Sequence, residues 1–285
     1  MKKILIQIDS DKIPSSFDSI TAIDSGVDHI LSYGGVLPGE LSDIVYGAMF
    51  TRGESDLKNS AVFIGGSNVT VGELMLKETL ECFFDNTRIS VMMDANGCNT
   101  TAAAAVRKIL SCGNIKGKNV TVLGGTGPVG MRAAGLLARE GAIVTITSRN
   151  PEKANDTCEV IAKRFDAEVT SACVNGIDEA DEIIGDSYAV LSAGTIGVTM
   201  LSESGWKNNP SIKVLADVNA VPPFGIDGIK PHWSAKEKEG KLIFGSIGIG
   251  GLKMKVHREC ISLLFEQNDM VLDAEGIYNV ASRLN

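Results

Sequence analysis

A glycine-rich turn between two β-branched segments constrains this chain more than any other feature of its sequence. Residues 119–124 predict a buried strand, and a strict G-x-G-x-x-G pattern follows it over 125–130. A helical segment over 128–140 and a second strand over 143–147 come next. A bare G-x-G-x-x-G is a weak signal, but this strand–turn–helix–strand context is typical of a dinucleotide-binding turn.

Each glycine of the pattern has a predicted role. Gly125 would permit the tight turn, Gly127 would let the backbone approach a pyrophosphate, and Gly130 would let the helix pack closely on the strand. Free N–H groups at the helix N-terminus would then favour phosphate binding. The alternative is a turn that only joins strand to helix. Predicted cofactor contacts along the turn are Gly125, Thr126, Gly127, Pro128, Val129 and Gly130.

The rest of the chain alternates β-rich and helical segments, which is typical of an α/β protein with largely parallel sheets. Predicted strands are 3–9, 60–65, 88–94, 119–124, 143–147, 167–173, 188–193, 213–218 and 242–246. Predicted helices are 15–24, 69–84, 100–112, 128–140, 151–165, 178–185, 251–267 and 273–284.

A length of 285 residues is enough for two domains. A polar, glycine-containing connector at 113–118 marks the predicted boundary. We therefore expect an N-terminal α/β substrate domain over 1–112 and a Rossmann-like, parallel-sheet NADP domain over 113–254. The helices within 255–285 are candidates for packing back on the first domain.

Composition argues against several classes of function. A net charge of −8 and a pI near 5.0 disfavour nucleic-acid binding through a broad basic surface. No apolar stretch approaches the ~20 residues of a membrane span, and the N-terminal apolar run is too short for a signal peptide. The six cysteines form no C-x-x-C pair and the three histidines are scattered, so we expect no metal site. These features predict a cytoplasmic protein with free thiols.

The second strand of the predicted nucleotide fold ends in Ser148 and Arg149. NAD-specific sites carry an acidic residue near this point for the ribose 2′-hydroxyl, and none is present here. Ser148 can donate a hydrogen bond, Arg149 can pair with a 2′-phosphate, and Lys153 adds charge nearby. The pattern predicts NADP, with NAD as the weaker cofactor. The alternative is that Arg149 is an ordinary surface charge.

Two later strand ends bear on the same predicted crevice. Ala193 and Gly194 form a small-residue end that would let the cofactor approach closely. Asp217 and Asn219 follow another strand, where ligands of open α/β sheets bind. We expect all four to contact the cofactor; the alternative is ordinary turn and cap chemistry.

Four further residues are candidates for the substrate side. From the residues alone, Phe17 is interpreted as a core residue, Thr101 as a helix N-terminal residue and Lys253 as a surface residue. His257 lies four positions after Lys253, so the two share one helix face. A lone histidine of this kind is more often structural than catalytic.

Long landmarks of the chain resemble the NADP-dependent methylene-tetrahydromethanopterin dehydrogenases of one-carbon-metabolising microbes. The resemblance runs from Ile4 to about Tyr278. Its landmarks are Pro14–Asp18, Tyr46–Arg52, Asp94–Ala104, Gly125–Arg132 and Gly245–His257. It implies two α/β domains related in fold to the methylene-tetrahydrofolate dehydrogenases, the first carrying much of the pterin-binding surface and the second carrying NADP.

The resemblance also implies a reaction and a site. A hydride would pass from methylene-tetrahydromethanopterin, or from methylene-tetrahydrofolate as a further substrate, to NADP, giving the methenyl form. The implied active-site residues are Phe17, Thr101, Lys253 and His257. Members of the family that the chain resembles form trimers, so the resemblance implies a homo-oligomer.

The chain departs from the pattern of its relatives in two places. Asn150 stands where family members often have a second basic residue, which weakens the expected exclusivity for NADP. The segment after Phe265 diverges, so no residue is transferred there. The folate-specific cousins with cyclohydrolase activity resemble one another in a Tyr-x-x-x-Lys pair. No tyrosine here has a lysine four residues later, so we expect no efficient methenyl hydrolysis.

Two other functions fit the nucleotide pattern. One is an NADP-dependent oxidoreductase of a small carbonyl or hydroxy substrate, which needs a general acid/base that His257 would supply. The other is a non-catalytic NADP sensor whose assembly changes with its ligand.

Overall fold

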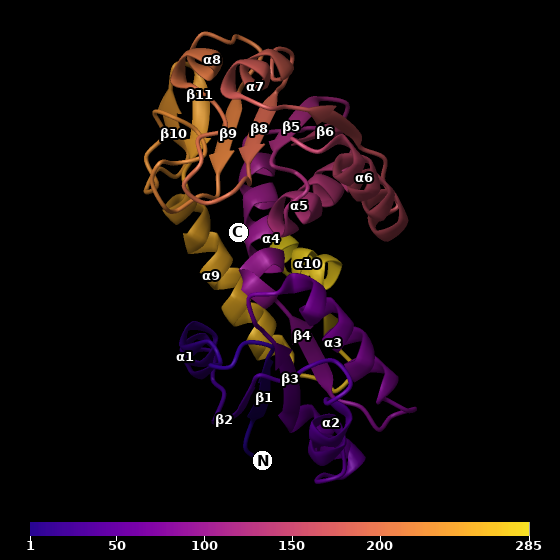
Figure 1. Ribbon diagram of the computed structural model, residues 1–285. Coiled ribbons are helices and arrows are strands. Elements are labelled where there is room, and N and C mark those ends of the chain that lie inside the picture. Colours follow the sequence, from indigo (N-terminus) through magenta and orange to yellow (C-terminus); the bar gives the residue numbers. More distant parts are fainter. Residues whose placement is uncertain (285) are drawn as a thin grey trace. The chain divides into compact units, whose positions relative to one another are not determined.

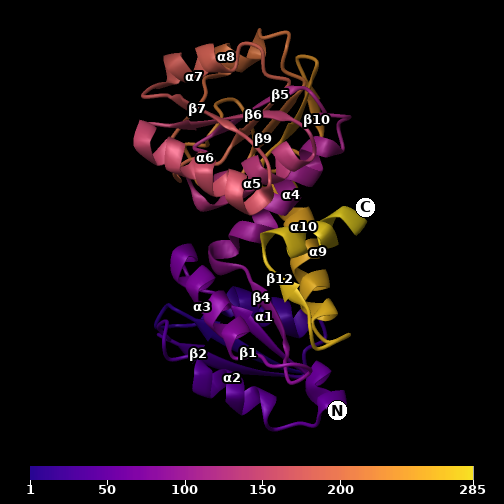
Figure 2. The same ribbon diagram turned by 90° about the vertical axis from the view of Figure 1, so that its right-hand side faces the viewer.

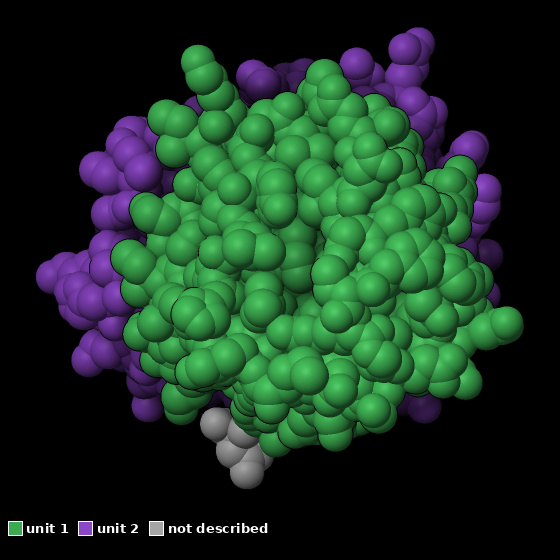
Figure 3. Space-filling view, turned by 90° about the horizontal axis from the view of Figure 1, so that it is seen from below, with its two compact units in different colours: residues 1–100, 254–285 green, residues 101–253 purple. Residues whose placement is uncertain are grey.

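The computed structural model describes residues 1–284, which form two compact units (Figures 1 and 3). Unit 1 comprises Met1–Thr100 and the residues from Met254 onward, and unit 2 comprises Thr101–Lys253. The chain passes into unit 2 within helix α4 (Cys98–Leu110) and returns to unit 1 within helix α9 (Ser246–Leu263).

Unit 1 is built on a parallel sheet with the strand order β12-β4-β3-β1-β2. Its strands are β1 (Ile4–Asp9), β2 (His29–Gly34), β3 (Ser60–Ile64), β4 (Ser90–Met93) and β12 (Val271–Leu272). Every residue of β3 and β4 is buried. Such continuous burial is typical of parallel strands covered on both faces.

Helices cover both faces of the unit 1 sheet. They are α1 (Ser16–Asp24), α2 (Ser42–Met49), α3 (Val69–Glu81) and α10 (Ala274–Arg283), with short 3₁₀ segments at Glu54–Asn59 and Ala95–Gly97. Figures 1 and 2 show α2 and α3 on one side of the sheet and α1 on the other. Side chains of Ser15, Asn68 and Asp273 accept first-turn N–H groups, which explains where α1, α3 and α10 begin.

Unit 2 is built on a seven-stranded sheet with the order β10-β11-β9-β8-β5-β6-β7. All neighbouring pairs are parallel except β10–β11. The six parallel strands therefore have the doubly wound Rossmann order. The strands are β5 (Asn119–Leu123), β6 (Ile143–Ser148), β7 (Thr170–Cys173), β8 (Ala189–Ser192), β9 (Val214–Asp217), β10 (Lys236–Lys238) and β11 (Lys241–Phe244).

Two pairs of helices pack in unit 2. Helices α5 (Pro128–Arg139) and α6 (Pro151–Phe165) contact each other and strands β5 to β7. Helices α7 (Ile177–Ile183) and α8 (Glu203–Lys207) form the second pair. The core beneath α7 and α8 centres on Trp206, which is fully buried and donates its indole N–H to the Asp227 carbonyl oxygen at 2.8 Å.

The α/β fold class with a Rossmann-like parallel sheet is confirmed, and each predicted strand and helix overlaps an element of the structure. The sequence analysis missed β2, β10, β12, α2 and α8. Strand β2 lies at the sheet edge with five of its six residues exposed, so it lacks the buried apolar run by which a parallel strand is recognised.

Helix α9 begins at Ser246, five residues before its predicted start, because tertiary contacts compensate for a glycine-rich first turn. The N–H groups of Ile247 and Gly248 both donate to the Pro231 carbonyl oxygen, at 2.8 and 3.1 Å. A side chain at Gly248 would collide with the Trp233 carbonyl oxygen. The glycine here permits a close backbone approach that a sequence pattern does not reveal.

No helix in the described part of the chain, residues 1–284, has the length and apolar character needed to cross a bilayer.

We predict that Gly135→Ala destabilises unit 2. A methyl group at Gly135 in α5 would lie 2.5 Å from Cγ of Phe165 at the end of α6, so the two helices would have to separate. Overpacking of this kind costs about 1–3 kcal/mol of unfolding free energy, measurable by chemical denaturation.

The matched control is Gly47→Ala in α2, where an added methyl group meets nothing within 4 Å. This change should stabilise the protein by about 0.5–1 kcal/mol, because alanine is the better helix former. Equal stability of Gly135→Ala and the wild type would contradict the packing assigned to α5 and α6.

Candidate functional site

A pocket of about 560 Å³ lies at the carboxyl ends of the unit 2 strands. The chain leaves the central strand β5 towards β6 on one side and later returns to β8 on the other. Such a switch point is where open α/β sheets bind ligands. Seven predicted cofactor residues line the pocket: Thr126, Gly127, Pro128, Ser148, Arg149, Ala193 and Gly194. Gly125, Val129, Gly130, Asp217 and Asn219 are not among the lining residues.

The tight turn after β5 depends on Gly124, and the prediction that Gly125 supplies it is wrong. Gly124 has a φ of +70°, which favours glycine, and a methyl group on it would lie 2.5 Å from Cα of Gly194. Gly125 instead packs against β6, where a methyl group would lie 2.5 Å from Cβ of Ile146. A methyl group at Gly130 would lie 2.7 Å from the Gly124 carbonyl oxygen, so α5 packs closely on the turn.

Gly127 meets a different requirement from its neighbours. A methyl group there would lie 3.5 Å from the nearest protein atom, the Gly124 carbonyl oxygen, so the protein itself tolerates a side chain. Gly127 is also the N-cap of α5 and makes no side-chain capping bond. The start of α5 therefore has the open, positively polarised backbone that suits a phosphate oxygen.

One end of the pocket combines polar and basic side chains from the end of β6 and the start of α6. Ser148, Arg149, Asn150 and Lys153 all line it. The Ser148 hydroxyl oxygen accepts from the Asn150 N–H at 3.1 Å, so its own proton is directed elsewhere. Asn150 Oδ1 accepts from the Lys153 N–H at 3.0 Å and caps α6. Asn150 thus begins the helix that carries Lys153.

Asp217 serves turn and cap chemistry at the end of β9. It is 1% exposed, and its carboxylate accepts from the Asn219 N–H at 2.9 Å and the Ile226 N–H at 3.0 Å. Burial raises the pKa of Asp217 from 3.8 to about 6, against the opposing effect of these hydrogen bonds. This carboxylate holds the loop between β9 and Ile226 in place.

The carboxyl ends of the unit 1 strands form a second switch point, because β2 and β3 lie on opposite sides of β1. Buried acidic side chains organise the loops there. Asp9 accepts from the Asp11 N–H at 2.8 Å and the Ser15 N–H at 3.1 Å, while its burial raises its pKa. Asp94 accepts from the Thr100 hydroxyl at 2.6 Å and fixes the start of α4.

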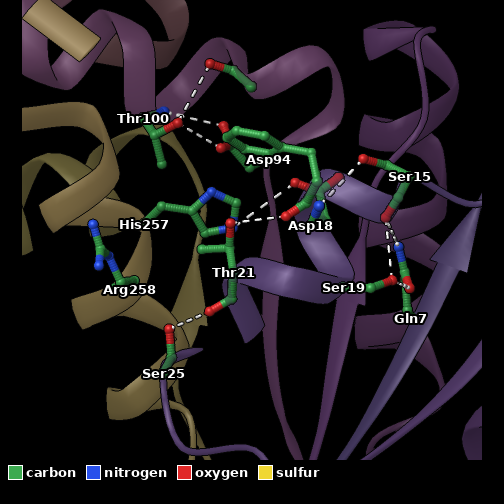
Figure 4. A network of polar contacts seen from close by, with 12 residues as sticks. Gln7, Ser15, Asp18, Ser19, Thr21, Ser25, Asp94, Thr100, His257 and Arg258 are labelled. Carbon is green, nitrogen blue, oxygen red and sulfur yellow. Dashed lines mark hydrogen bonds and ion pairs between the residues drawn. The ribbon is translucent and has the colours of Figure 1, made fainter. Parts of the chain in front are cut away.

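The structure brings together Phe17 and His257, which belong to the N-terminal and the C-terminal segment of unit 1. Their ring centroids are 6.2 Å apart, and the His257 ring stacks on Phe63 at 5.6 Å. Phe17 is 48% exposed, so its interpretation as a core residue is wrong. His257 is 1% exposed, and its Nε2 lies 4.0 Å from Oδ1 of Asp18 (Figure 4).

Thr101 in α4 and Lys253 in α9 both belong to unit 2 and are partly buried. The preceding Thr100 is fully buried, and its hydroxyl donates to Asp94 at the start of α4. Thr101, in contrast, is only partly buried. The sequence analysis missed Asp18, which reads as a helix-capping acid in the pattern Ser15-x-x-Asp18.

Within residues 1–284, no group of three or more histidine, cysteine, aspartate or glutamate side chains is arranged to hold a metal ion.

The fold is shared with solved enzymes of known activity. A shikimate 5-dehydrogenase from Listeria monocytogenes, solved with shikimate and NAD, superposes with a TM-score of 0.60 over 98% of this chain and 96% of that one. The two sequences are 17% identical, so this likeness concerns the fold alone.

The sequence comparisons identify closer relatives. A family model described as "Methylene-tetrahydromethanopterin dehydrogenase, N-terminal" matches residues 16–96. The NAD(P)-dependent methylenetetrahydromethanopterin dehydrogenase of Methylorubrum extorquens is 28% identical over 98% of both chains. The bifunctional protein MdtA of the same organism is 44% identical over 99% of both chains. This chain therefore belongs to the methylene-tetrahydromethanopterin dehydrogenase family of NAD(P)-dependent oxidoreductases.

Proposed function

We propose that this chain oxidises methylene-tetrahydromethanopterin to its methenyl form with NADP as hydride acceptor, and that methylene-tetrahydrofolate is a second substrate. The observation that carries the proposal is the switch-point pocket of unit 2, whose basic end suits a 2′-phosphate, in a chain of this family.

The reaction needs alignment more than acid/base chemistry. A C–H bond of the methylene bridge breaks, and its electron pair leaves with the hydrogen to C4 of the nicotinamide, which NADP supplies when bound. No proton moves in this step, so the protein needs no general base. Its residues must instead hold donor carbon and acceptor at near-attack distance, on the order of 3–3.5 Å.

The residues of the pocket fit the phosphates of NADP. Gly127 and the uncovered first turn of α5 would bind the pyrophosphate. Ser148, with its hydroxyl proton directed away from Asn150, would donate to the 2′-phosphate, and Arg149 would pair with it. Lys153, in the first turn of α6, would supply the second positive charge that Asn150 does not.

The remaining predicted cofactor contacts are Gly125, Thr126, Pro128, Val129, Gly130, Ala193, Gly194, Asp217 and Asn219. Ala193 and Gly194 line the pocket and would face the cofactor directly. Gly125, Gly130 and Asp217 shape the backbone around it, as their close contacts indicate.

Four side chains would serve the pterin. Phe17 presents a half-exposed ring for stacking on the substrate, and Thr101 would donate a hydrogen bond. Lys253 would hold polar groups of the substrate, and Lys253 and His257 would orient the bridge. An ammonium beside a growing cation would oppose the reaction, so Lys253 would direct its charge to a pterin carbonyl.

We further propose that the protein forms a homo-oligomer, a trimer by resemblance to its family.

Spectrophotometric NADPH assays with both methylene pterins and both nicotinamide cofactors test the proposal. We expect the highest kcat/KM with methylene-tetrahydromethanopterin and NADP, and no methenyl hydrolysis above the uncatalysed rate. Lys253→Ala and His257→Ala should each lower kcat/KM.

Three results would go against this function. Turnover of a small carbonyl compound without turnover of either pterin would favour a different NADP oxidoreductase. Tight NADP binding with a change of assembly and no hydride transfer would favour a sensor. Full kcat/KM in both alanine variants would remove Lys253 and His257 from the site.

A second prediction concerns cofactor selection. Arg149→Ala should raise the Kd for NADP by about tenfold to a hundredfold and leave the Kd for NAD nearly unchanged, because only NADP carries the 2′-phosphate. Lys153→Ala should have the same effect in smaller measure. Isothermal titration of the wild type and of each variant with NADP and with NAD gives the Kd values to be compared.

Arg139→Ala is the matched control, since this arginine lies in the last turn of α5, away from the residues that line the pocket. Equal loss of NAD and NADP affinity in Arg149→Ala, or tighter binding of NAD than NADP by the wild type, would refute the preference.

A further inference from the structure

A carboxylate beside Phe17 has no role in the function described so far. We propose that Asp18 is a catalytic residue that stabilises the positive charge developing on the substrate, and that His257 positions it. This inference rests on the proposed hydride transfer and adds a residue to it.

The N–H of the residue that caps α1 is bonded to Asp9 and not to Asp18. In a capping box, an acid at the third helical position accepts from the N–H of the capping residue. Here Ser15 caps the helix by accepting from the Asp18 N–H at 3.3 Å, as expected. However, the Ser15 N–H donates to Oδ2 of Asp9 at 3.1 Å. Asp9 therefore accepts the hydrogen bond from the Ser15 N–H that a capping box would assign to Asp18.

The Asp18 carboxylate is turned towards His257 and the end of β3. Its Oδ1 lies 4.0 Å from Nε2 of His257 (Figure 4). A methyl group on Gly65, which directly follows β3, would lie 3.6 Å from its Oδ2. The carboxylate thus lies at the switch point of the unit 1 sheet, where a ligand is expected.

Exposure distinguishes the two members of the pair. The Asp18 side chain is 16% exposed, and the His257 side chain is 1% exposed. The imidazole stacks on Phe63 and lies beside Phe17, so both aromatic rings restrict its movement. Asp18 is therefore the member that a substrate can reach, and His257 is placed to hold the carboxylate in one orientation.

The change of charge during hydride transfer explains how the Asp18 carboxylate would assist the reaction. As the hydride leaves, positive charge disappears from the nicotinamide ring and appears on the N–C–N bridge of the pterin. A negative group on the pterin side therefore stabilises the transition state more than the ground state. Asp18 lies in the first turn of α1, and the half-exposed Phe17 ring beside it suits a flat cation.

The test compares Asp18→Asn, which removes the charge and keeps the shape, with Asp18→Glu, which keeps the charge. In Asp18→Asn we expect kcat to fall by about a hundredfold and Asp18→Glu to recover part of it. The Kd of the methylene substrate, whose bridge is neutral, should stay constant, while the Kd of the methenyl product, whose bridge is cationic, should rise by about tenfold. A merely structural role would weaken both affinities alike.

Asp43→Asn is the matched control, because Asp43 is an exposed acid in the first turn of α2. It should leave kcat and both Kd values unchanged. A His257→Gln change should lower kcat less than Asp18→Asn does. The double variant should be no slower than Asp18→Asn alone, since His257 acts through Asp18.

The outcomes separate this inference from the proposed function. A wild-type protein that oxidises no methylene pterin would refute the function itself. An active wild type with full kcat in folded Asp18→Asn, or with multiplicative losses in the double variant, would overturn only the role of Asp18. Equal weakening of methylene and methenyl binding would also overturn it.

Discussion

The arrangement of unit 2 depends on one close approach of backbone to backbone. Gly124 at the end of β5 faces Gly194 after β8, and a single methyl group on Gly124 would lie 2.5 Å from Cα of Gly194. The contact forms at the switch point, so it sets how the two strand ends meet around the pocket. Around it, Gly125 lies against β6 and Gly130 lets α5 begin close to the turn. The pocket is thus a consequence of backbone packing, and in the proposed function the side chains at its basic end would select between NADP and NAD.

Local patterns in the sequence predict most of the fold. The buried strands and the helices with clear caps are visible as apolar runs and periodicities, because burial dictates their residues. The edge strand β2 and the start of α9 are not visible in this way. Strand β2 is formed by pairing with β1 while its side chains remain exposed, and α9 begins early because Pro231 and Trp233 supply acceptors from a distant segment. Both features depend on tertiary contacts that no local window contains.

The candidate site likewise combines residues that local sequence patterns predict with residues that only tertiary contacts reveal. Thr126, Gly127, Ser148 and Arg149 are predictable because the nucleotide-binding turn and the strand after it fix their spacing. Their detailed roles are less predictable, since the left-handed conformation falls on Gly124 and not on Gly125. On the substrate side, the pairing of Asp18 with His257 joins the first and the last thirds of the chain. A sequence gives Asp18 only as a helix-capping acid, and the hydrogen bond from Ser15 to Asp9 is what distinguishes it.

A crystal structure of the protein with NADP bound tests the central claim most directly. The account predicts that the pyrophosphate lies on the backbone of Gly127 and the first turn of α5, with the 2′-phosphate between Ser148 and Arg149. A nucleotide bound away from the β5–β8 switch point, or one in this pocket with its 2′-phosphate directed away from Arg149, would contradict it.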